Sequence, residues 1–398
     1  MHARKIAAVI GVLIVIGAFI IAASYSKLRL SLPKPTWVQL DATPPPVKPA
    51  PKLMAESTWV TRGGGMLQGQ AAALPLKALK KRWEAKAGPA GESSPAIAKD
   101  VVYACGESGT IHALDLNSGK LLWTVDLDAP LSAAPLVLED KLLIGDQEGK
   151  FHALALPGGK ELWKFEAQQG MKSGANIVGD TVVFGSVDQT IYCLLAATGK
   201  EAWRVQTGGP VYPTPSVWQQ TVYAGGCDGS VHAVDAKTGE ERWAESGGGP
   251  IATSAICFAE KLAVGTMQGG RLTCMSARDG KAVWNQEVQG ADFYASPAWA
   301  DGLLVFAERG GDALCFSSDT GEKKWSFSNR SGFEAPPVIS GGGVYLAGRD
   351  GKLHVLELKT GKEVWTFLAG GKLNAPPAIA GGVMIVHDSA GTVYCLGE

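Results

Sequence analysis

Histidine and cysteine are the residues of this sequence best suited to bind a metal ion or to act in covalent chemistry. The chain of 398 residues contains six histidines and seven cysteines. Four histidines and two tyrosines occupy one position of a pattern that repeats about every 40 residues: His112, His152, His232, His354, Tyr192 and Tyr394. A zinc or copper site needs three or four ligands that meet at about 2 Å from one ion. Side chains spread one per repeat do not converge in this way, so we predict that each histidine packs and makes one hydrogen bond between repeats.

The cysteines follow the same repeat. Four of them share one position: Cys193, Cys274, Cys315 and Cys395. The other repeats place alanine or valine there, which indicates a small buried strand position where cysteine acts as an apolar residue. Equivalent positions in neighbouring repeats should exceed the Cα separation of about 4.4–6.8 Å that a disulfide needs, and an odd number of cysteines fits a disulfide framework poorly. We predict buried free thiols, with a disulfide or a reactive thiol as the alternative, and we expect Cys227 to be the most exposed.

The carboxylates and hydroxyls do not form a recognisable catalytic pattern. Asp115 and Asp235 belong to the repeat, and we expect them to accept hydrogen bonds from the turn that follows them. His387 lies beside a turn without a visible partner. A calcium site is not supported, because no loop has the dense aspartate pattern that calcium loops show. Nucleophile-elbow, metalloprotease and phosphate-loop motifs are also missing from the sequence. We therefore predict no catalytic, cofactor-binding or metal-binding residue.

Tryptophan marks the elements that must position all these residues. Eight tryptophans follow one another at intervals of 40 or 41 residues: Trp83, Trp123, Trp163, Trp203, Trp243, Trp284, Trp325 and Trp365. A short glycine turn such as Thr198-Gly199-Lys200 precedes seven of them. A fixed period of this length indicates one supersecondary unit copied many times.

Each unit contains four short β-rich runs separated by turn residues, which predicts a four-stranded antiparallel meander. Such units assemble as the blades of a β-propeller. The last unit stops at Glu398 without its tryptophan strand, whereas Trp83 has no unit before it. We predict an all-β, eight-bladed propeller over residues 76–398. The strand of Trp83 should pair with residues 393–395 and close the ring, because closure removes both free sheet edges.

The N-terminal residues have a different composition. Residues 6–24 contain an uncharged run from Ile6 to Ala23 that is long enough for a transmembrane signal-anchor helix. Arg4 and Lys5 favour a cytoplasmic location for residues 1–5, and residues 25–75 form a Pro/Gly-rich linker. We expect a single-pass protein of the inner (cytoplasmic) membrane with its propeller on the periplasmic side. A secreted or periplasmic protein after signal cleavage is the alternative.

The repeat resembles a known family. Residues 109–115 (GTIHALD), the turn Ser118-Gly119-Lys120 and Trp123 look like the PQQ-like (pyrroloquinoline quinone) propeller repeat, and in particular like that of BamB-type envelope propellers. The resemblance implies that the eight tryptophans dock neighbouring blades. It also implies a non-catalytic, monomeric scaffold that binds an envelope protein partner in outer-membrane protein assembly. The chain departs from BamB-type proteins because no lipoprotein cysteine follows the apolar run.

The same resemblance includes quinoprotein dehydrogenases, which bind PQQ and calcium at the centre of the ring and carry adjacent cysteines. This sequence has no adjacent cysteines, and its repeats are almost uninterrupted. We therefore expect a non-enzyme without a cofactor. An enzyme or sensor that binds PQQ or another small ligand in the central channel is the alternative. Nucleic acid is not an expected partner, because the net charge is −1.

One position varies where its neighbours repeat. It lies three residues before the proline or alanine that opens each unit: Glu92, Ser132, Lys172, Tyr212, Ala252, Tyr294, Glu334 and Asn374. In a propeller these residues should surround the mouth of the central channel. Nearby side chains add charge and aromatic surface suited to a protein partner: Asp292, Phe293, Arg330, Phe333 and Lys372. The alternative is that these are ordinary variable loop residues.

Overall fold

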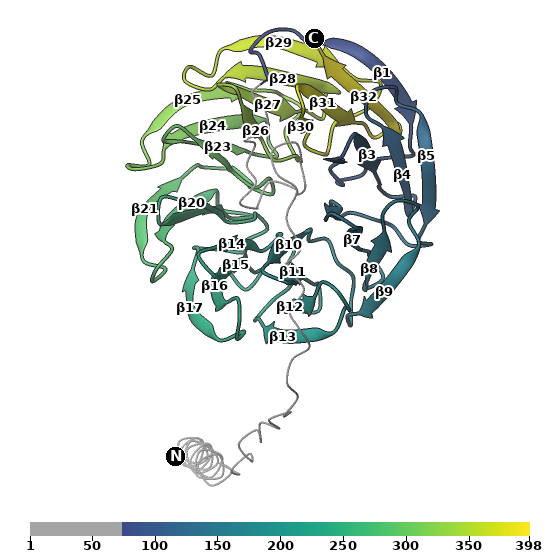
Figure 1. Ribbon diagram of the computed structural model, residues 1–398. Coiled ribbons are helices and arrows are strands. Elements are labelled where there is room, and N and C mark those ends of the chain that lie inside the picture. Colours follow the sequence, from purple (N-terminus) through teal and green to yellow (C-terminus); the bar gives the residue numbers. More distant parts are fainter. Residues whose placement is uncertain (1–73) are drawn as a thin grey trace, which may run out of the picture. The chain divides into compact units, whose positions relative to one another are not determined.

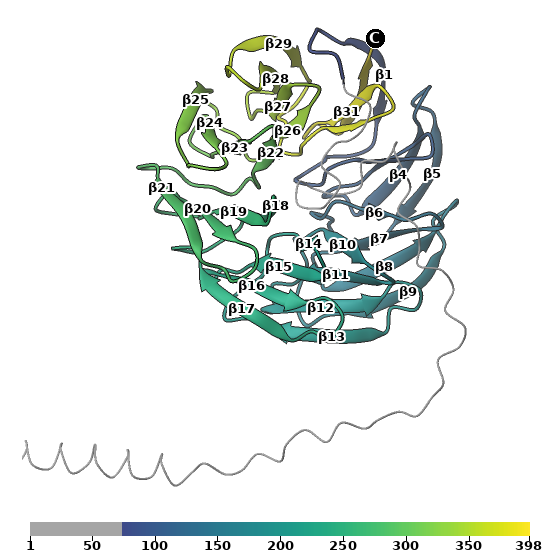
Figure 2. The same cartoon turned by 60° about the vertical axis from the view of Figure 1, so that its left-hand side comes forward.

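The computed structural model describes residues 74–398, which form a ring of eight four-stranded antiparallel sheets (Figures 1 and 2). The predicted eight-bladed all-β propeller is confirmed. In each blade a short inner strand lines the channel and the fourth strand lies at the outer edge. Within residues 74–398, no helix has both the length and the apolar character needed to cross a bilayer. The predicted segment 6–24 and most of the linker lie outside the described residues.

The first four blades lie between Ala96 and Ser246. Their strands are β2 (Ala96–Ala98), β3 (Val101–Ala104), β4 (Thr110–Asp115), β5 (Leu121–Asp126), β6 (Leu136–Val137), β7 (Lys141–Gly145), β8 (Lys150–Ala155), β9 (Glu161–Glu166), β10 (Ala175–Val178), β11 (Thr181–Gly185), β12 (Thr190–Leu195), β13 (Glu201–Gln206), β14 (Ser216–Trp218), β15 (Thr221–Gly225), β16 (Ser230–Asp235) and β17 (Glu241–Ser246).

The other four blades include both ends of the described chain. Their strands are β18 (Ile256–Phe258), β19 (Lys261–Gly265), β20 (Arg271–Ser276), β21 (Ala282–Glu287), β22 (Ala298–Ala300), β23 (Leu303–Ala307), β24 (Asp312–Ser317), β25 (Lys323–Ser328), β26 (Val338–Ser340), β27 (Gly343–Ala347), β28 (Lys352–Glu357), β29 (Glu363–Leu368), β30 (Ala378–Ala380), β31 (Val383–His387), β32 (Thr392–Gly397) and β1 (Lys80–Lys86).

The ring closes through β1, which is the outer strand of the eighth blade. The sheet order is β1-β32-β31-β30, and Trp83 is paired with Cys395. Lys86 Nζ donates to Thr392 Oγ1 at 2.6 Å across this pair of strands. The predicted pairing of the Trp83 strand with residues 393–395 is therefore confirmed, and one blade joins residues about 300 positions apart in sequence.

The tryptophans lie between blades. Trp203 is 8% exposed and its indole Nε1 donates to Ala236 O of the next blade at 3.0 Å. Its ring covers Gly239, where an added Cβ would approach Trp203 within 2.8 Å and where φ is +75°. Only glycine suits both the left-handed backbone and this close approach. The same tryptophan–glycine contact recurs from Trp83 and Gly119 to Trp325 and Gly361.

The second and third strands of each blade carry the core. The thiols of four cysteines are completely buried in these layers: Cys193, Cys274, Cys315 and Cys395. All seven cysteines are free, and only Cys227 and Cys257 are partly exposed. Burial raises the pKa of the Cys193 thiol to about 12. The prediction of buried free thiols is confirmed.

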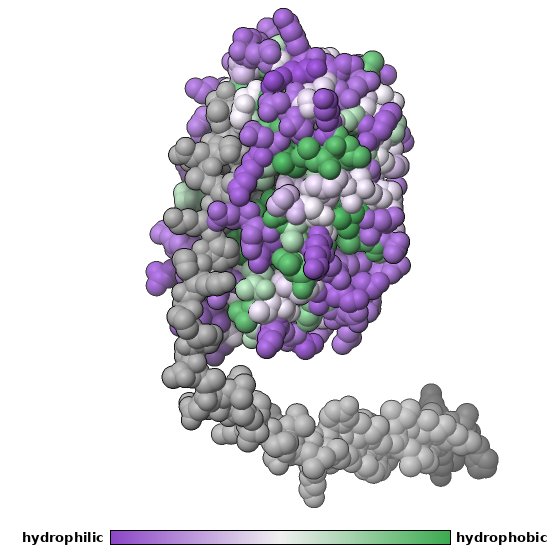
Figure 3. All heavy atoms as spheres, turned by 45° about the vertical axis from the view of Figure 1, so that its right-hand side comes forward, coloured by the Kyte–Doolittle hydropathy of each residue, from purple (hydrophilic) through white to green (hydrophobic). Residues whose placement is uncertain are grey.

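The outer strands are mostly polar, with apolar exceptions. Leu121 and Leu122 on β5 are 57% and 52% exposed, and Leu162 on β9 is 49% exposed. The flank of the ring that Figure 3 turns forward shows hydrophobic patches between hydrophilic side chains. These leucines add little to the core, because about half of each side chain stays exposed. Single exposed apolar residues are normal, since more than half of the surface of a folded protein is contributed by apolar atoms.

Candidate functional site

Six of the eight variable loop positions line one cavity at the mouth of the central channel. They are Glu92, Lys172, Tyr212, Ala252, Tyr294 and Glu334. The cavity has a volume of about 370 Å³. Each residue precedes the inner strand of its own blade, so the ring geometry brings together residues from six different repeats.

Cations lie over both tyrosines of the mouth. Lys172 Nζ is 5.4 Å from the centroid of the Tyr212 ring. The guanidinium carbon of Arg309 is 4.8 Å from the centroid of the Tyr294 ring. Cation–π contacts of this kind hold both partners in place and are worth about 0.5–2 kcal/mol. The mouth therefore presents two aromatic rings, each with a cation over its face.

Glu334 joins two arginines at the same rim. Arg309 approaches Glu334 Oε1 through Nε and Nη2, both at 2.9 Å, and Arg349 Nη1 lies 3.5 Å from the same oxygen. The hydrogen bond to Glu334 raises the pKa of Arg309 above its usual value. The two arginines share this carboxylate, and the charge of Asp292 also acts on Arg309, so the rim has an ion-pair network at this point.

Arg309 and Arg349 were not among the predicted site residues, because they come from another loop. Each lies in the turn between the second and third strands of its blade. The backbone N–H of Arg309 donates to Asp292 O at 3.1 Å, and that of Arg349 donates to Gly332 O at 3.2 Å. The same bond recurs around the ring, for example from Cys227 to Pro210. This turn position also varies between repeats, and that variation could have revealed it.

The floor of the cavity is built from hydroxyl groups that connect blades. Thr214 Oγ1 accepts the backbone N–H of Gly174 at 3.0 Å, Ser254 Oγ accepts that of Thr214 at 3.0 Å, and Ser296 Oγ accepts that of Ser254 at 2.8 Å. Each hydroxyl thus links an inner strand to its neighbour. These hydroxyls make the floor polar and rigid.

The prediction that Phe293 and Phe333 contribute aromatic surface to the rim is wrong. Phe293 is 0% exposed and Phe333 is 1% exposed. The Phe293 ring packs against Phe306, with 5.8 Å between centroids. Consecutive side chains of an extended segment point to opposite sides, so Tyr294 faces the channel while Phe293 enters the core. The phenylalanine position is apolar in every repeat from Leu131 onward, which is the sequence signature of a buried position.

The remaining predicted rim residues do not line the cavity. Asp292 accepts the backbone N–H of Gln268 at 3.1 Å and so stabilises a loop. Arg330 and Lys372 are exposed, and Asn374 is half-buried. Ser132 is buried and accepts a hydrogen bond from the side chain of Gln147.

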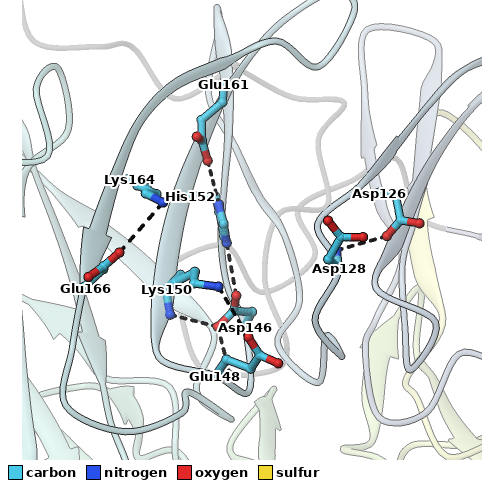
Figure 4. Close-up of polar contacts among 9 residues, drawn as sticks. All are labelled: Asp126, Asp128, Asp146, Glu148, Lys150, His152, Glu161, Lys164 and Glu166. Carbon is cyan, nitrogen blue, oxygen red and sulfur yellow. Dashed lines mark hydrogen bonds and ion pairs between the residues drawn. The ribbon is translucent and has the colours of Figure 1, made fainter.

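Three of the four repeat histidines, His152, His232 and His354, lie between two acids of their own blade, whereas His112 is half-buried and its Nδ1 has no hydrogen-bond partner. Figure 4 shows the group of His152. His152 lies 2.8 Å from Glu161 through Nδ1 and 3.1 Å from Asp146 through Nε2. Burial by itself would lower the pKa of His152, but the bonds to Asp146 and Glu161 raise it overall. The expected single hydrogen bond between blades is therefore wrong for His152, because a strand end and a turn of the same blade provide both partners.

His232 and His354 repeat this arrangement. His232 lies 2.7 Å from Glu241 and 2.9 Å from Asp228, and His354 lies 2.6 Å from Glu363. All three histidine side chains are less than 10% exposed. Residues 74–398 contain no group of three or more His, Cys, Asp or Glu arranged to hold a metal ion. These groups consequently join the strands and the turn of a blade.

His387 has a partner that the sequence did not reveal. Its Nε2 bonds Gly88 O at 2.8 Å, and the side chain is buried. Burial lowers the pKa of His387 to about 4. The contact joins β31 to the segment that follows the ring-closing strand β1, so His387 belongs to the closure of the ring.

Comparison of the sequence with models of known protein families identifies a family for this chain. The model of the family described as outer membrane protein assembly factor BamB matches residues 77–156, 147–296, 228–340 and 311–397. The chain belongs to the BamB family. The resemblance of its repeat to BamB-type propellers is therefore confirmed, and the match extends over nearly all of the described residues. None of the curated proteins matches the chain.

Solved structures share the fold at low sequence identity. BamB from Moraxella catarrhalis is 21% identical, with a TM-score of 0.71 over 80% of this chain and 98% of that one. The computationally designed protein Ika8 is 18% identical, with a TM-score of 0.70 over 83% of this chain and 100% of that one. Quinohemoprotein alcohol dehydrogenase ADHIIG from Pseudomonas putida HK5 is 13% identical, with a TM-score of 0.71 over 84% of this chain and 77% of that one. At these identities the structural likeness establishes the propeller fold alone. The function has to be argued from the residues of the site.

Proposed function

We propose that this BamB-family chain is a non-catalytic scaffold of the bacterial cell envelope that docks a protein partner at the mouth of its channel. The observation that carries the proposal is the cavity lined by Lys172, Tyr212, Tyr294 and Arg309. Tyrosine and arginine are enriched at the energetic centres of protein interfaces. Here each tyrosine has a cation over its ring and Arg309 is also bound to Glu334, and contacts of this kind favour a partly ordered surface before a partner binds.

The proposal includes a location. The uncharged run of residues 6–24 would hold the chain in the inner membrane as a single-pass anchor, and the propeller would act on the periplasmic side. A protein with these properties, in the family of an outer membrane protein assembly factor, fits a role in that assembly. The partner is then an envelope protein that contacts one propeller.

A double variant tests the docking proposal. Tyr212→Ala with Tyr294→Ala removes both rings while leaving the buried Phe293 in place. Pull-down from native envelope membranes should lose the proteins that co-purify with the unmodified chain. A matched control is the double variant Lys120→Ala with Lys359→Ala, since both residues are exposed in turns at the opposite ends of the strands. An unchanged set of proteins with the tyrosine variant would contradict docking at the mouth.

The size of the cavity favours a second candidate function, the binding of a small ligand. A volume of about 370 Å³ falls within the range of roughly 300–1,000 Å³ typical of ligand pockets. The engagement of the Glu334 carboxylate by Arg309 and Arg349 weighs against PQQ with calcium as that ligand, because calcium needs six to eight oxygen ligands. Addition of PQQ and calcium to the purified chain tests directly whether the cavity binds this cofactor. A cofactor absorbance band with dye-linked alcohol oxidation would overturn the scaffold proposal.

A further inference from the structure

Lys172 and Tyr212, the cation–π pair of the mouth, lie on two loops with the same construction. Residues 167–174 lead into β10, and residues 207–215 lead into β14. In both blades the turn between the second and third strands lies against the incoming loop. A backbone hydrogen bond joins this turn to the loop two residues before Lys172 or Tyr212. Because the same bond recurs around the ring, it does not by itself distinguish these two loops.

An aspartate of each turn adds a second hydrogen bond to its loop. In the third blade, Asp188 Oδ2 accepts the backbone N–H of Gln168 at 3.0 Å. In the fourth blade, Asp228 Oδ2 accepts the backbone N–H of Gly208 at 2.9 Å. Gln168 and Gly208 both come four residues before the mouth residue of their loop. Each loop is therefore joined to its turn at two places just before it reaches the cavity.

A buried ring binds each aspartate, and its type differs between the two blades. Tyr192 donates its hydroxyl hydrogen to Asp188 Oδ2 at 2.9 Å. His232, at the equivalent repeat position, lies with Nε2 2.9 Å from Asp228 Oδ2 and with Nδ1 2.7 Å from Glu241. Tyr192 is 2% exposed and His232 is 7% exposed, so water competes little for either bond. In both blades one carboxylate oxygen thus bonds the ring and the loop, and we call each aspartate with its ring a clamp.

We infer that Tyr192 and His232 are positioning residues for the docking site at the mouth. Each acts through the turn aspartate that it binds, and that aspartate holds the loop that presents one member of the Lys172–Tyr212 pair. Hydrogen bonds to an ionised carboxylate are roughly twice as strong as neutral ones, which suits a contact that restrains a loop. The inference rests on the proposed docking function and adds that the partner recognises the pair in one arrangement.

The repeat itself supplies a conservative replacement for His232. Six repeats carry histidine or tyrosine at this position. Ala244 lies opposite His232 on β17 and leaves room for a larger ring. His232→Tyr should therefore place a hydroxyl at Asp228, as Tyr192 does in the third blade. His232→Phe fills the same space but has no hydrogen to donate, so the two variants differ in the clamp alone.

Fluorine NMR of the full chain with 3-fluorotyrosine at position 212 reports the order of this loop without a partner. His232→Phe should broaden or split the resonance, and His232→Tyr should restore it. His152→Phe is the matched control, because it breaks the same kind of acid–histidine–acid group while Ser132, the mouth-loop residue of its blade, does not line the cavity. An unchanged resonance in His232→Phe, or an equal change in His152→Phe, would overturn the inference. Circular dichroism shows whether each variant is folded.

Pull-down from native envelope membranes extends the test to docking. His232→Phe should lower the recovery of co-purifying proteins about five- to tenfold, as expected when the net contribution of about one hydrogen bond is lost. His232→Tyr should return recovery to the level of the unmodified chain. Equal losses in both variants, or full recovery with His232→Phe, would overturn the positioning role. If the unmodified chain recovers no protein, the docking proposal fails, whereas the fluorine comparison still decides whether the clamp orders the loop.

Discussion

His387 should make ring closure sensitive to acid. Its imidazole is buried against Gly88 O, with His112 and Asp388 as the nearby titratable groups, and burial lowers its pKa to about 4. In the unfolded chain a histidine has a pKa of about 6.5. The unfolded state therefore binds more protons between these two values, and stability must fall as the pH is lowered from about 6.5 to about 4. At about 1.4 kcal/mol per pKa unit, the loss is about 3 kcal/mol.

The assay compares the unmodified protein with His387→Gln, which keeps a side-chain amide able to donate to Gly88 O and cannot titrate. Denaturant unfolding followed by circular dichroism at pH 7.5, 6, 5 and 4 gives the difference in unfolding free energy. As the pH is lowered from 7.5 to 4, the unmodified protein should lose about 3 kcal/mol more unfolding free energy than His387→Gln does. Parallel pH profiles of the two proteins would refute the assignment of a neutral, buried His387.

Other predictions concern the core and the thiols. Trp203→Ala should lower the unfolding free energy by about 3–5 kcal/mol, because it deletes a large buried side chain. Gly239→Ala should also destabilise the protein, because its Cβ would meet the Trp203 ring. Denaturant titration measures both variants, and midpoints equal to that of the wild type would contradict the docking contact. His152→Gln should cost more stability at pH 5–6 than at pH 8.5, because the raised pKa of His152 adds stability below its unfolded value and this is lost as the pH rises; an equal cost at all pH values would exclude a charged pair. In the native protein a thiol reagent should modify Cys227 first, since five thiols are buried and burial raises the pKa of the sixth, that of Cys257, to about 12. Cys227→Ser should remove the fastest phase of the reaction.

The fold was predictable because each repeat carries its own turn and packing signals. Trp203 and Gly239 are separated by 36 positions, and the equivalent pairs by 36 or 37, so their contact follows from the period once blades are stacked. Ring closure was predictable because Trp83 and residues 393–395 are complementary fragments of one unit. The pairing of His152 with two acids in its own blade was not predicted, because Asp146 and Glu161 become neighbours only after the strands pair.

The site was predictable in part. Ring geometry brings one variable position of each repeat to the channel, so Tyr212 and Tyr294 could be placed together from sequence alone. Phe293 was misassigned because adjacency in sequence was taken for adjacency in space, although alternate side chains point apart. Arg309 was missed because it lies in the turn between β23 and β24, which a backbone hydrogen bond to Asp292 O holds beside the loop that leads into β22.

The most direct test of the scaffold proposal is site-specific photo-crosslinking in native envelope membranes. A benzophenone amino acid at Tyr294 would lie at the mouth, and the same group at Lys120 would lie in an exposed turn at the opposite end of the strands. The proposal predicts a discrete protein adduct from position 294 that is lost when Tyr212 is replaced by alanine, with no such adduct from position 120. Absence of an adduct at 294, or the same adduct at both positions, would contradict docking at the channel mouth.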